Sequence, residues 1–239
     1  MNVWISDLQA RFAACSNRNE AEAMKTYMRG QFEFAGIKSP LRKSVVGEWL
    51  SSRGPVPAGL LEQTVLGLWE LPEREFQYAA MDVLAKQAKR LDERHLEMLE
   101  SLVVTKPWWD TVDIIAASLI GPILLRDPLL APMRAELWIT SDDMWLQRTA
   151  LLFQLKYKRN TDEDLLFDHI RRTAESREFF IRKAIGWALR EYSKTDPGAV
   201  IRFVESEPLS PLSKREALKW LDRRRSGIVP ETNGQPSTH

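Results

Sequence analysis

The sequence of 239 residues is poor in cysteine and histidine, with one cysteine and three histidines. One cysteine excludes a disulfide framework and a cysteine-rich zinc site, and it is typical of a protein of the reducing cytosol. Eleven glycines and thirteen prolines are too few for a collagen-like or low-complexity chain. Because 44% of the residues are hydrophobic, the chain has enough apolar material for a folded core.

Long hydrophobic runs are also missing. The longest apolar stretch, residues 114–125, is about half the length of a membrane span and contains Gly121 and Pro122. The first 14 residues include Asp7 and Arg11, where a signal peptide would be uniformly apolar. We therefore expect a soluble cytoplasmic protein that has no membrane partner.

Neither sign of charge is in excess over the whole chain, whose formal net charge is +1, but the charges are unevenly distributed. Residues 1–145 carry 16 basic and 20 acidic side chains, a net charge of −4. Residues 146–225 carry 18 basic and 12 acidic side chains, a net charge of +6. The basic part is consistent with a polyanionic partner such as nucleic acid. Many helical proteins have such an imbalance for no functional reason, so charge alone leaves both interpretations open.

Hydrophobic periodicity predicts helices throughout, and no run of strictly alternating residues indicates a strand. Apolar residues recur at positions i, i+3, i+4, i+7 and i+8 in two segments that start at Phe76 and Ile181. Helix-start signals, such as a proline or an N-cap residue before an apolar pattern, recur along the chain. They lie at residues 39–40, 71–73, 106–107, 141–143, 161–163 and 210–211. The predicted fold class is all-α.

An internal repeat indicates how these helices are organised. The segment SPLRK at 39–43 recurs as SPLSK at 210–214, and each is followed by Trp-Leu at the same offset. The small residues Ala80, Ala150, Ala184 and Ala217 are spaced by 70, 34 and 33 positions. A period of 33 to 35 predicts stacked helix pairs, an α-solenoid of about six HEAT-like repeats with a concave binding face. The alternative is an ordinary helical bundle in which the similarity arises by chance.

The domain organisation follows from this repeat. We expect one domain over residues 1–225, in which residues 1–30 form capping helices that cover the open end of the solenoid. Residues 226–239 have the composition of a flexible tail, so His239 is not expected to bind metal. His95 and His169 lie on polar, amphipathic segments and are expected at the solvated surface.

The standard catalytic signatures are absent: there is no glycine-rich phosphate loop, no nucleophile elbow and no zinc-binding HExxH. Tryptophan, in contrast, is abundant, with nine in the chain. Trp109 and Asp113 are four residues apart, so a helix would place both on one face, with Trp108 directed into the core. A carboxylate beside an indole can hold a cation through its charge and through the ring quadrupole. The alternative is an acidic residue in a first helical turn beside a packed tryptophan.

Two further segments lie at the repeat spacing. Arg148 follows Asp113 by 35 residues, which in a solenoid means the adjacent helix at the same height, so an ion pair between them is expected. Residues 179–190 contain Trp187 among basic neighbours, and Gly186 leaves room for a close approach beside it. Individually these residues are compatible with packing aromatics and solvated arginines. Together they predict a face of indoles, one carboxylate and many cations.

These segments closely resemble those of the AlkD family of bacterial DNA glycosylases, HEAT-like-repeat enzymes that excise alkylated purines. The resemblance runs from the N-terminal helices to about Leu221, and motifs of this length are highly specific. The matching stretches are residues 71–77, 104–113, 145–148, 152–158, 179–192 and 211–217. Pro107 occupies a position at which the family has a small polar residue, and the C-terminal tail does not resemble the family. Neither departure changes a residue at the positions of the family's site residues.

The resemblance implies a monofunctional glycosylase, without lyase activity, that acts in base excision repair on 3-methyladenine and 7-methylguanine in double-stranded DNA. It places the catalytic aspartate on Asp113 and the two lesion-side tryptophans on Trp109 and Trp187. It places the conserved arginine on Arg148 and the N-terminal aromatic on Tyr27. It also implies that the target base is not flipped into a pocket, unlike in most glycosylases.

Basic side chains near these motifs are candidates for phosphate contacts. They are Arg148, Lys156, Arg182, Lys183, Arg190 and Lys214, and Arg148 is also a candidate for tuning Asp113. We expect no cofactor and no metal, and a monomer that associates with the nucleoid of a bacterium through DNA. The competing hypothesis is a non-catalytic helical-repeat scaffold that binds structured DNA or protein, in which Asp113 and the tryptophans serve packing alone.

Overall fold

A computed structural model describes residues 2–226, which form helices and no strand; the one extended pairing is an isolated bridge between Glu33 and Glu73. The chain divides into two compact units, Met1–Leu119 and Ile120–His239, and each is described by itself. The expected tail lies outside the described residues, apart from Ser226. Within the described part of the chain, no helix combines the length and the apolar character needed to cross a bilayer.

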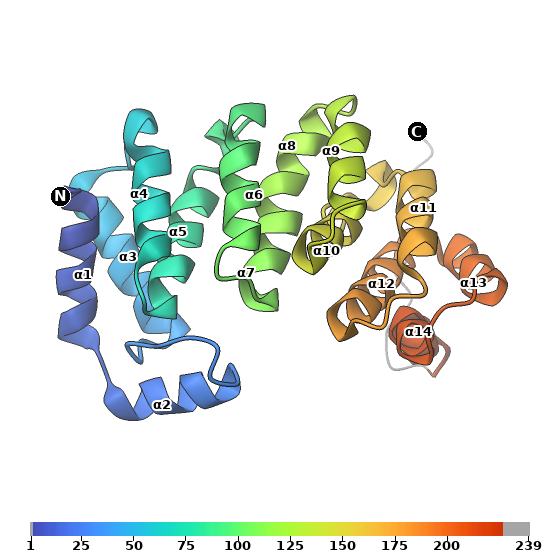
Figure 1. Ribbon diagram of the computed structural model, residues 1–239, viewed down its shortest axis with the longest axis horizontal. Helices are drawn as coiled ribbons and strands as arrows, with labels where there is room; N and C mark the ends of the chain where they lie inside the picture. The colour runs from blue at the N-terminus through green and yellow to red at the C-terminus, as the bar shows by residue number, and fades with distance from the viewer. Residues whose placement is uncertain (1, 227–239) are drawn as a thin grey trace, which may run out of the picture. The chain divides into compact units, whose positions relative to one another are not determined.

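The first unit consists of three consecutive helix pairs and one additional helix (Figure 1). The pairs are α1 (Val3–Cys15) with α3 (Ser39–Arg53), α4 (Ala58–Glu70) with α5 (Arg74–Lys86), and α6 (Leu96–Val104) with α7 (Trp109–Ile114). Helices α1, α4 and α6 form one row, and α3, α5 and α7 form the other. The additional helix, α2 (Arg18–Tyr27), has no buried residue. Two helices therefore lie within the first 30 residues, and their role as caps of a solenoid stays a prediction.

The second unit repeats this arrangement. A π-helical stretch, Ile115–Ile120, continues α7 at the end of the first unit and leads without a break into α8 (Gly121–Arg126), the first helix of the second. The next helices are α9 (Leu130–Ile139), α10 (Met144–Leu152), α11 (Glu163–Thr173), α12 (Phe179–Tyr192), α13 (Pro197–Ser206) and α14 (Pro211–Arg225). Helices α10, α12 and α14 pack side by side in one row, and α9 contacts α11 in the other. The predicted all-α helical-repeat fold is confirmed.

The predicted core positions are buried. The two periodic segments form α5 and α12, and every apolar position of the pattern is buried: Phe76, Ala79, Ala80, Val83, Leu84, Ile181, Ala184, Ile185, Ala188 and Leu189. The alanines that mark the repeat are at most 2% exposed. A methyl group at these positions lets neighbouring helices approach closely, which explains why small residues recur at the repeat spacing.

The helix-start signals are confirmed to within two residues. The repeated segments SPLRK and SPLSK begin α3 and α14, which are both 15 residues long and have proline in the first turn. Asp143 and Asp162 are N-caps whose carboxylates accept backbone N–H groups of α10 and α11. The signal at 106–107 is the least accurate, because α7 begins at Trp109.

Two predictions of burial are wrong. His169 is 1% exposed, because it belongs to the buried face of α11 together with Leu166, Ile170 and Thr173. Its Nδ1 lies 3.3 Å from the carbonyl oxygen of Ala150. Trp108 is half-buried and is the N-cap of α7, so it is not a core residue.

Candidate functional site

Helix α7 presents the predicted acidic and aromatic pair. Trp109 and Asp113 are its first and fifth residues, so they share one helical face, and both are half-buried. The π-helical stretch begins two residues after Asp113. Such stretches are rare in proteins overall, but where they occur they are often part of a functional site. The local geometry therefore keeps a carboxylate and an indole together on a partly accessible face.

Trp109 and Tyr27 line the same cavity, of about 470 Å³. Its lining includes Ala23, Met24 and Tyr27 of α2, together with Tyr78 of α5 and Trp109 of α7. Glu20, Met28, Phe34, Lys38 and Asp110 complete the lining. Tyr27 is 73% exposed, so its ring is available to a partner. Two residues that the sequence places in the site, 82 positions apart, thus meet within the first unit.

A buried ion pair holds the beginning of α7. The guanidinium of Arg74, fully buried at the start of α5, donates to both carboxylate oxygens of Asp110, at 2.7 and 3.2 Å. It also donates to the carbonyl oxygen of Lys106 and to Oγ1 of Thr111, each at 2.9 Å. A bidentate arginine–carboxylate pair is both strong and geometrically specific.

The hydroxyl of Tyr78 completes this network by donating to Oδ2 of Asp110 at 2.6 Å. Burial, and then the negative charge of Asp110, raise the pKa of Tyr78 well above its usual value. The hydroxyl therefore keeps its proton. Sequence analysis missed Arg74, Tyr78 and Asp110 as site-shaping residues, although two of them lie in the motif stretches 71–77 and 104–113.

A second buried charge holds the segment that follows α2. The carboxylate of Glu75 accepts the backbone N–H groups of Ala35, Gly36 and Ile37, at 2.9 to 3.0 Å. Gly36 has φ of +81°, and a Cβ there would lie 1.9 Å from the carbonyl oxygen of Asn17, so only glycine fits. The sequence does not predict this contact, because a glutamate in the first turn of a helix is usually a solvated residue.

In the second unit, Trp187 lies on α12 beside a close helix contact. A Cβ at Gly186 would lie 2.5 Å from Cβ of Glu216 and 2.9 Å from the carbonyl oxygen of Ser213. Both residues belong to α14, and Oγ of Ser213 also donates to the carbonyl oxygen of Arg182 at 3.0 Å. The predicted close approach beside Trp187 is therefore confirmed, with α14 as the neighbour.

The predicted phosphate-binding cations differ in exposure. Lys156 is exposed, whereas Arg182 and Lys214 are half-buried. Lys183 and Arg190 share one carboxylate, with distances of 3.1 and 2.9 Å to the two oxygens of Glu216. Burial works to raise the pKa of Glu216, but the cations, led by Lys183, hold it below its usual value. This carboxylate offsets one of the two positive charges.

Arg148 is not an exposed cation. It is 4% exposed and donates from its guanidinium to the carbonyl oxygen of Phe180, which ties α10 to the start of α12. Its Cζ lies 5.9 Å from the ring centroid of Phe180. The expected ion pair between Arg148 and Asp113 stays a prediction.

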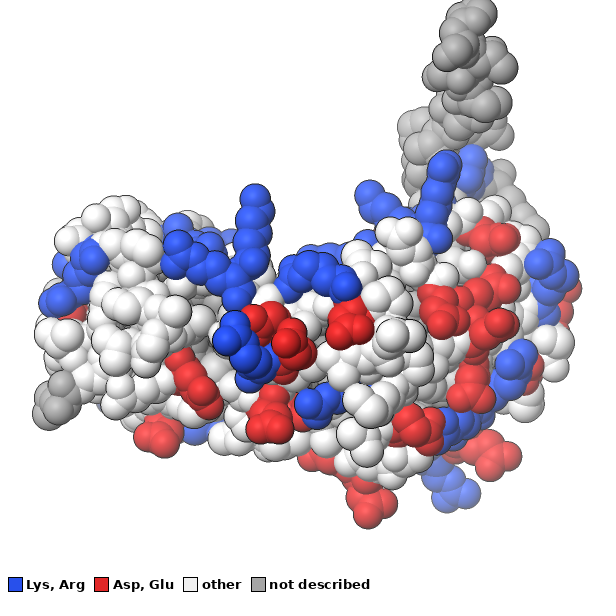
Figure 2. Space-filling view, turned by 90° about the horizontal axis from the view of Figure 1, so that it is seen from above, with Lys and Arg blue, Asp and Glu red and all other residues white. Residues whose placement is uncertain are grey.

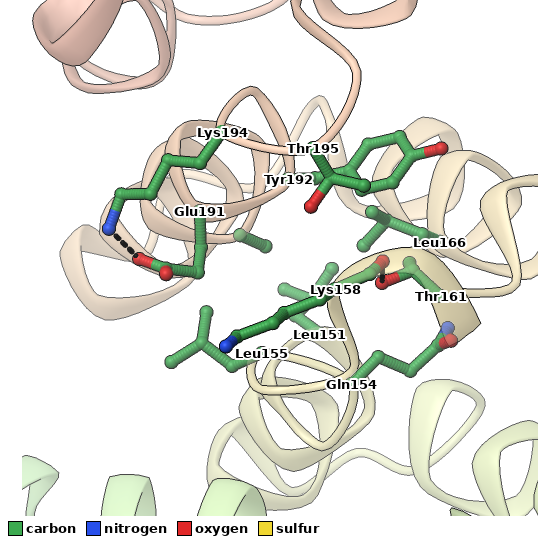
Figure 3. Close-up of a pocket in the computed structure, with 11 residues that line it drawn as sticks. Leu151, Gln154, Leu155, Lys158, Thr161, Leu166, Glu191, Tyr192, Lys194 and Thr195 are labelled. Atoms are coloured by element: carbon green, nitrogen blue, oxygen red, sulfur yellow. Dashed lines mark hydrogen bonds and ion pairs between the residues drawn. The ribbon is translucent and has the colours of Figure 1, made fainter. Parts of the chain in front are cut away.

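The surface and the remaining cavities add little to this site. On the face shown in Figure 2, acidic side chains lie among basic ones, so this face does not carry charge of a single sign. A smaller cavity of about 170 Å³ in the second unit has an apolar floor that includes Leu151 and Leu166 (Figure 3). On its rim Lys194 pairs with Glu191 at 2.6 Å. None of the predicted site residues lines it.

The fold is that of an all-α helical-repeat protein, and α7 presents an aromatic and an acidic residue on one face. Residues 8–221 match the family model described as DNA alkylation repair enzyme, so the chain belongs to that family and has a role in the repair of alkylated DNA. Its structure is similar to that of a predicted DNA alkylation repair enzyme from Enterococcus faecalis, with 35% sequence identity and a TM-score of 0.81. That similarity covers 86% of this chain and 96% of the other. No curated protein matches the sequence.

Proposed function

We propose that the protein is a monofunctional DNA glycosylase that hydrolyses the N-glycosyl bond of cationic N3- and N7-alkylpurines in double-stranded DNA, as part of base excision repair. The observation that carries this proposal is the pairing of Trp109 with Asp113 on one face of α7, in a member of the DNA alkylation repair family. Tyr27, which lines the same cavity as Trp109, adds an exposed aromatic ring.

The chemistry of the substrate explains why so few catalytic groups suffice. Alkylation at N3 or N7 gives the purine a positive charge, so it leaves readily and needs little help from a general acid. As the C1′–N bond stretches, positive charge develops on the deoxyribose. A carboxylate next to the sugar stabilises this transition state more than the ground state. We assign that role to Asp113, which can also orient the attacking water.

The tryptophans are proposed to act on the same developing charge. The electron-rich faces of Trp109 and Trp187 would contact the deoxyribose, and each such contact is worth roughly 0.5–2 kcal/mol. Both contacts together correspond to a rate gain of about 5- to 1,000-fold. Because the contacts are to the sugar, the base need not enter a pocket, and bulky adducts would be tolerated.

Phosphate contacts would come from the basic side chains of the second unit, namely Lys156, Arg182, Lys183, Arg190 and Lys214. The buried position of Arg148 favours a role in orienting the site over a direct phosphate contact. We further propose that residues 1–225 act as one domain and as a monomer, in a bacterial cytoplasm.

The test is release of free 7-methylguanine from a methylated duplex under single-turnover conditions, with EDTA present to check that no metal is needed. Asp113→Asn should lower the rate by about 100-fold or more while DNA affinity stays nearly the same, as expected for a group that acts in the transition state. Asp164→Asn, the same change at an exposed residue of α11, is the matched control. A folded Asp113→Asn protein with the wild-type rate would overturn the assignment, and no release by the wild type would favour the scaffold hypothesis.

A further inference from the structure

We propose that the first two turns of α5 form the positioning element of the site: Arg74, Glu75 and Tyr78 hold the segments that carry Tyr27 and Trp109, so that both rings face one cavity. That this element contributes to catalysis rests on the proposed function. That it positions the rings of Tyr27 and Trp109 does not. None of the three is proposed to react with the substrate. They would act through the residues that they hold.

The α7 side of this element needs external support. Helix α7 continues without a break through the π-helical stretch into α8, and at its beginning the N-cap, Trp108, makes no side-chain capping bond. The backbone N–H groups of a first helical turn have no partner within the helix, so the position of this turn depends on contacts from other segments. Arg74 supplies four hydrogen bonds to residues 106–111, two of them to Asp110, the neighbour of Trp109. The position of the indole therefore depends on a guanidinium that lies on another helix.

The α2 side depends on the same turn of α5. No residue of α2 is buried, so apolar packing holds this helix only weakly. The segment after it is fixed instead by Arg74, whose backbone N–H donates to the carbonyl oxygen of Glu33 at 2.8 Å. The ring of Phe32 lies over the guanidinium, 3.8 Å from Cζ to the centroid. Glu75 binds the three N–H groups of residues 35–37.

Tyr78 connects this support to the cavity. It lies one turn after Arg74, its ring is part of the cavity wall, and its hydroxyl donates to Asp110. The guanidinium of Arg42, paired with Asp82 at 3.2 Å, lies 4.8 Å from the ring centroid and fixes the ring from the other side. Loss of the hydroxyl would leave the packing of the ring intact and release one of the bonds that orient Asp110.

The most informative variant is therefore Tyr78→Phe, because replacing Arg74 would leave the carboxylate of Asp110 without its ion pair, and replacing Glu75 would leave three backbone N–H groups without an acceptor. Its matched control is Tyr192→Phe, which removes a tyrosine–carboxylate bond of 2.8 Å, to Glu163, in the second unit. Each protein is labelled with 5-fluorotryptophan, and the ¹⁹F signal of Trp109 is assigned from its absence in Trp109→Phe. The single-turnover rate at saturating enzyme and the affinity for undamaged duplex are measured on the same samples.

We expect Tyr78→Phe to shift or broaden the ¹⁹F signal of Trp109 and to lower the single-turnover rate by about 3- to 30-fold, since displacements of about 1 Å are costly in active sites. DNA affinity should stay within about twofold of the wild type. Tyr192→Phe should change none of these three quantities.

An unchanged Trp109 signal in Tyr78→Phe would overturn the proposal. So would a loss of affinity at an unchanged rate, which would make Tyr78 a binding wall and not a positioning residue. If the wild type releases no base, the proposed function fails, but the ¹⁹F comparison still decides whether Tyr78 positions Trp109.

Discussion

The two units hold their tryptophans by different physical means. In the first unit, Trp109 is the first residue of α7, whose beginning is held by a buried network of Arg74, Asp110 and Tyr78. In the second unit, Trp187 lies on a 14-residue helix, next to a glycine that lets α14 approach within van der Waals contact. Hydrogen bonds thus determine one position, and steric packing determines the other.

This difference predicts different sensitivities. Directional hydrogen bonds are sensitive to loss of a single donor, whereas close packing is sensitive to added volume. The units also differ in charge, since the basic excess lies in the second. We therefore expect substitutions that leave volume unchanged to affect the first unit, and added methyl groups or lost cations to affect the second.

The largest expected effect concerns the basic side chains of the second unit. With roughly four to six phosphate contacts, log K for duplex DNA should fall with a slope of about −3.5 to −5.5 against log salt. Between about 50 and 200 mM salt this is a loss of about 100- to 2,000-fold in affinity. Lys156→Ala should make the slope shallower by about one and weaken all sequences alike.

Fluorescence anisotropy titrations at several salt concentrations measure this slope. Lys194→Ala is the control, because Lys194, which pairs with Glu191, is not among the cations assigned to phosphate contacts. A slope near zero, or equal changes for Lys156→Ala and Lys194→Ala, would contradict the assignment of the second unit as the phosphate-binding part.

The next effect tests steric packing directly. Gly186→Ala places a methyl group against Glu216 and the backbone of Ser213, so the free energy of unfolding should fall by about 1–3 kcal/mol. Gly47→Ala, within α3 of the first unit, meets nothing within 4 Å and should raise it by up to about 1 kcal/mol. Urea unfolding measures both changes. Equal changes in the free energy of unfolding at the two glycines would contradict the claim that close packing beside Gly186 holds Trp187 in place.

A smaller effect is expected at the tryptophans themselves. Trp109→Ala and Trp187→Ala should each lower the single-turnover rate by about 2- to 30-fold, the equivalent of one cation–π contact. Phe at either position keeps an aromatic face but weakens it, so it should cost less. Quenched-flow release of 7-methylguanine gives these rates. Rates that are the same for Trp and Ala would identify the indoles as packing residues.

The smallest expected effect is a pH dependence of stability caused by His169, a buried side chain with fewer hydrogen-bond partners than the residues of the network around Arg74. His169 has no hydrogen-bond partner for Nε2, and burial, its largest influence, lowers its pKa from 6.5. Below about pH 6.5 the unfolded chain binds a proton at this residue that the folded protein does not bind. The free energy of unfolding should therefore fall as the pH drops, by at most about 1.4 kcal/mol per pH unit, until the pH reaches the folded-state pKa.

Urea unfolding at about pH 7.5 and pH 5.5 measures this loss. His169→Gln should reduce the pH dependence, whereas His95→Gln, at a half-buried residue, serves as the control. An identical pH dependence in the wild type and in His169→Gln would rule out this residue as the acid-sensitive group.

The comparison also explains which features the sequence could predict. Burial at Phe76 and Ile181 follows from periodicity, and the starts of α10 and α11 follow from the capping residues Asp143 and Asp162, because these signals are local. The pairing of Trp109 with Asp113 is local too, since it requires only that residues 109–113 be helical.

The features that could not be predicted depend on partners that are distant in the sequence. Arg74 and Glu75 resemble ordinary charged residues at a helix start, and only the fold brings them to Asp110 and to residues 35–37. His169 was placed at the surface because its neighbours in the sequence are charged, whereas its environment is the buried side of α11. The long motif 71–77 was the available signal, since two charged residues in it have no local role.

The central claim is that the protein stabilises positive charge on a sugar whose leaving group is itself cationic. The most direct test is a set of single-turnover rates for the wild type on duplexes that contain 7-methylguanine, 3-methyladenine, hypoxanthine or uracil. The account predicts release of the two cationic purines and no enzymatic release of the two neutral bases. Efficient release of uracil or hypoxanthine would show that the site recognises the base and not its charge, and would contradict the mechanism.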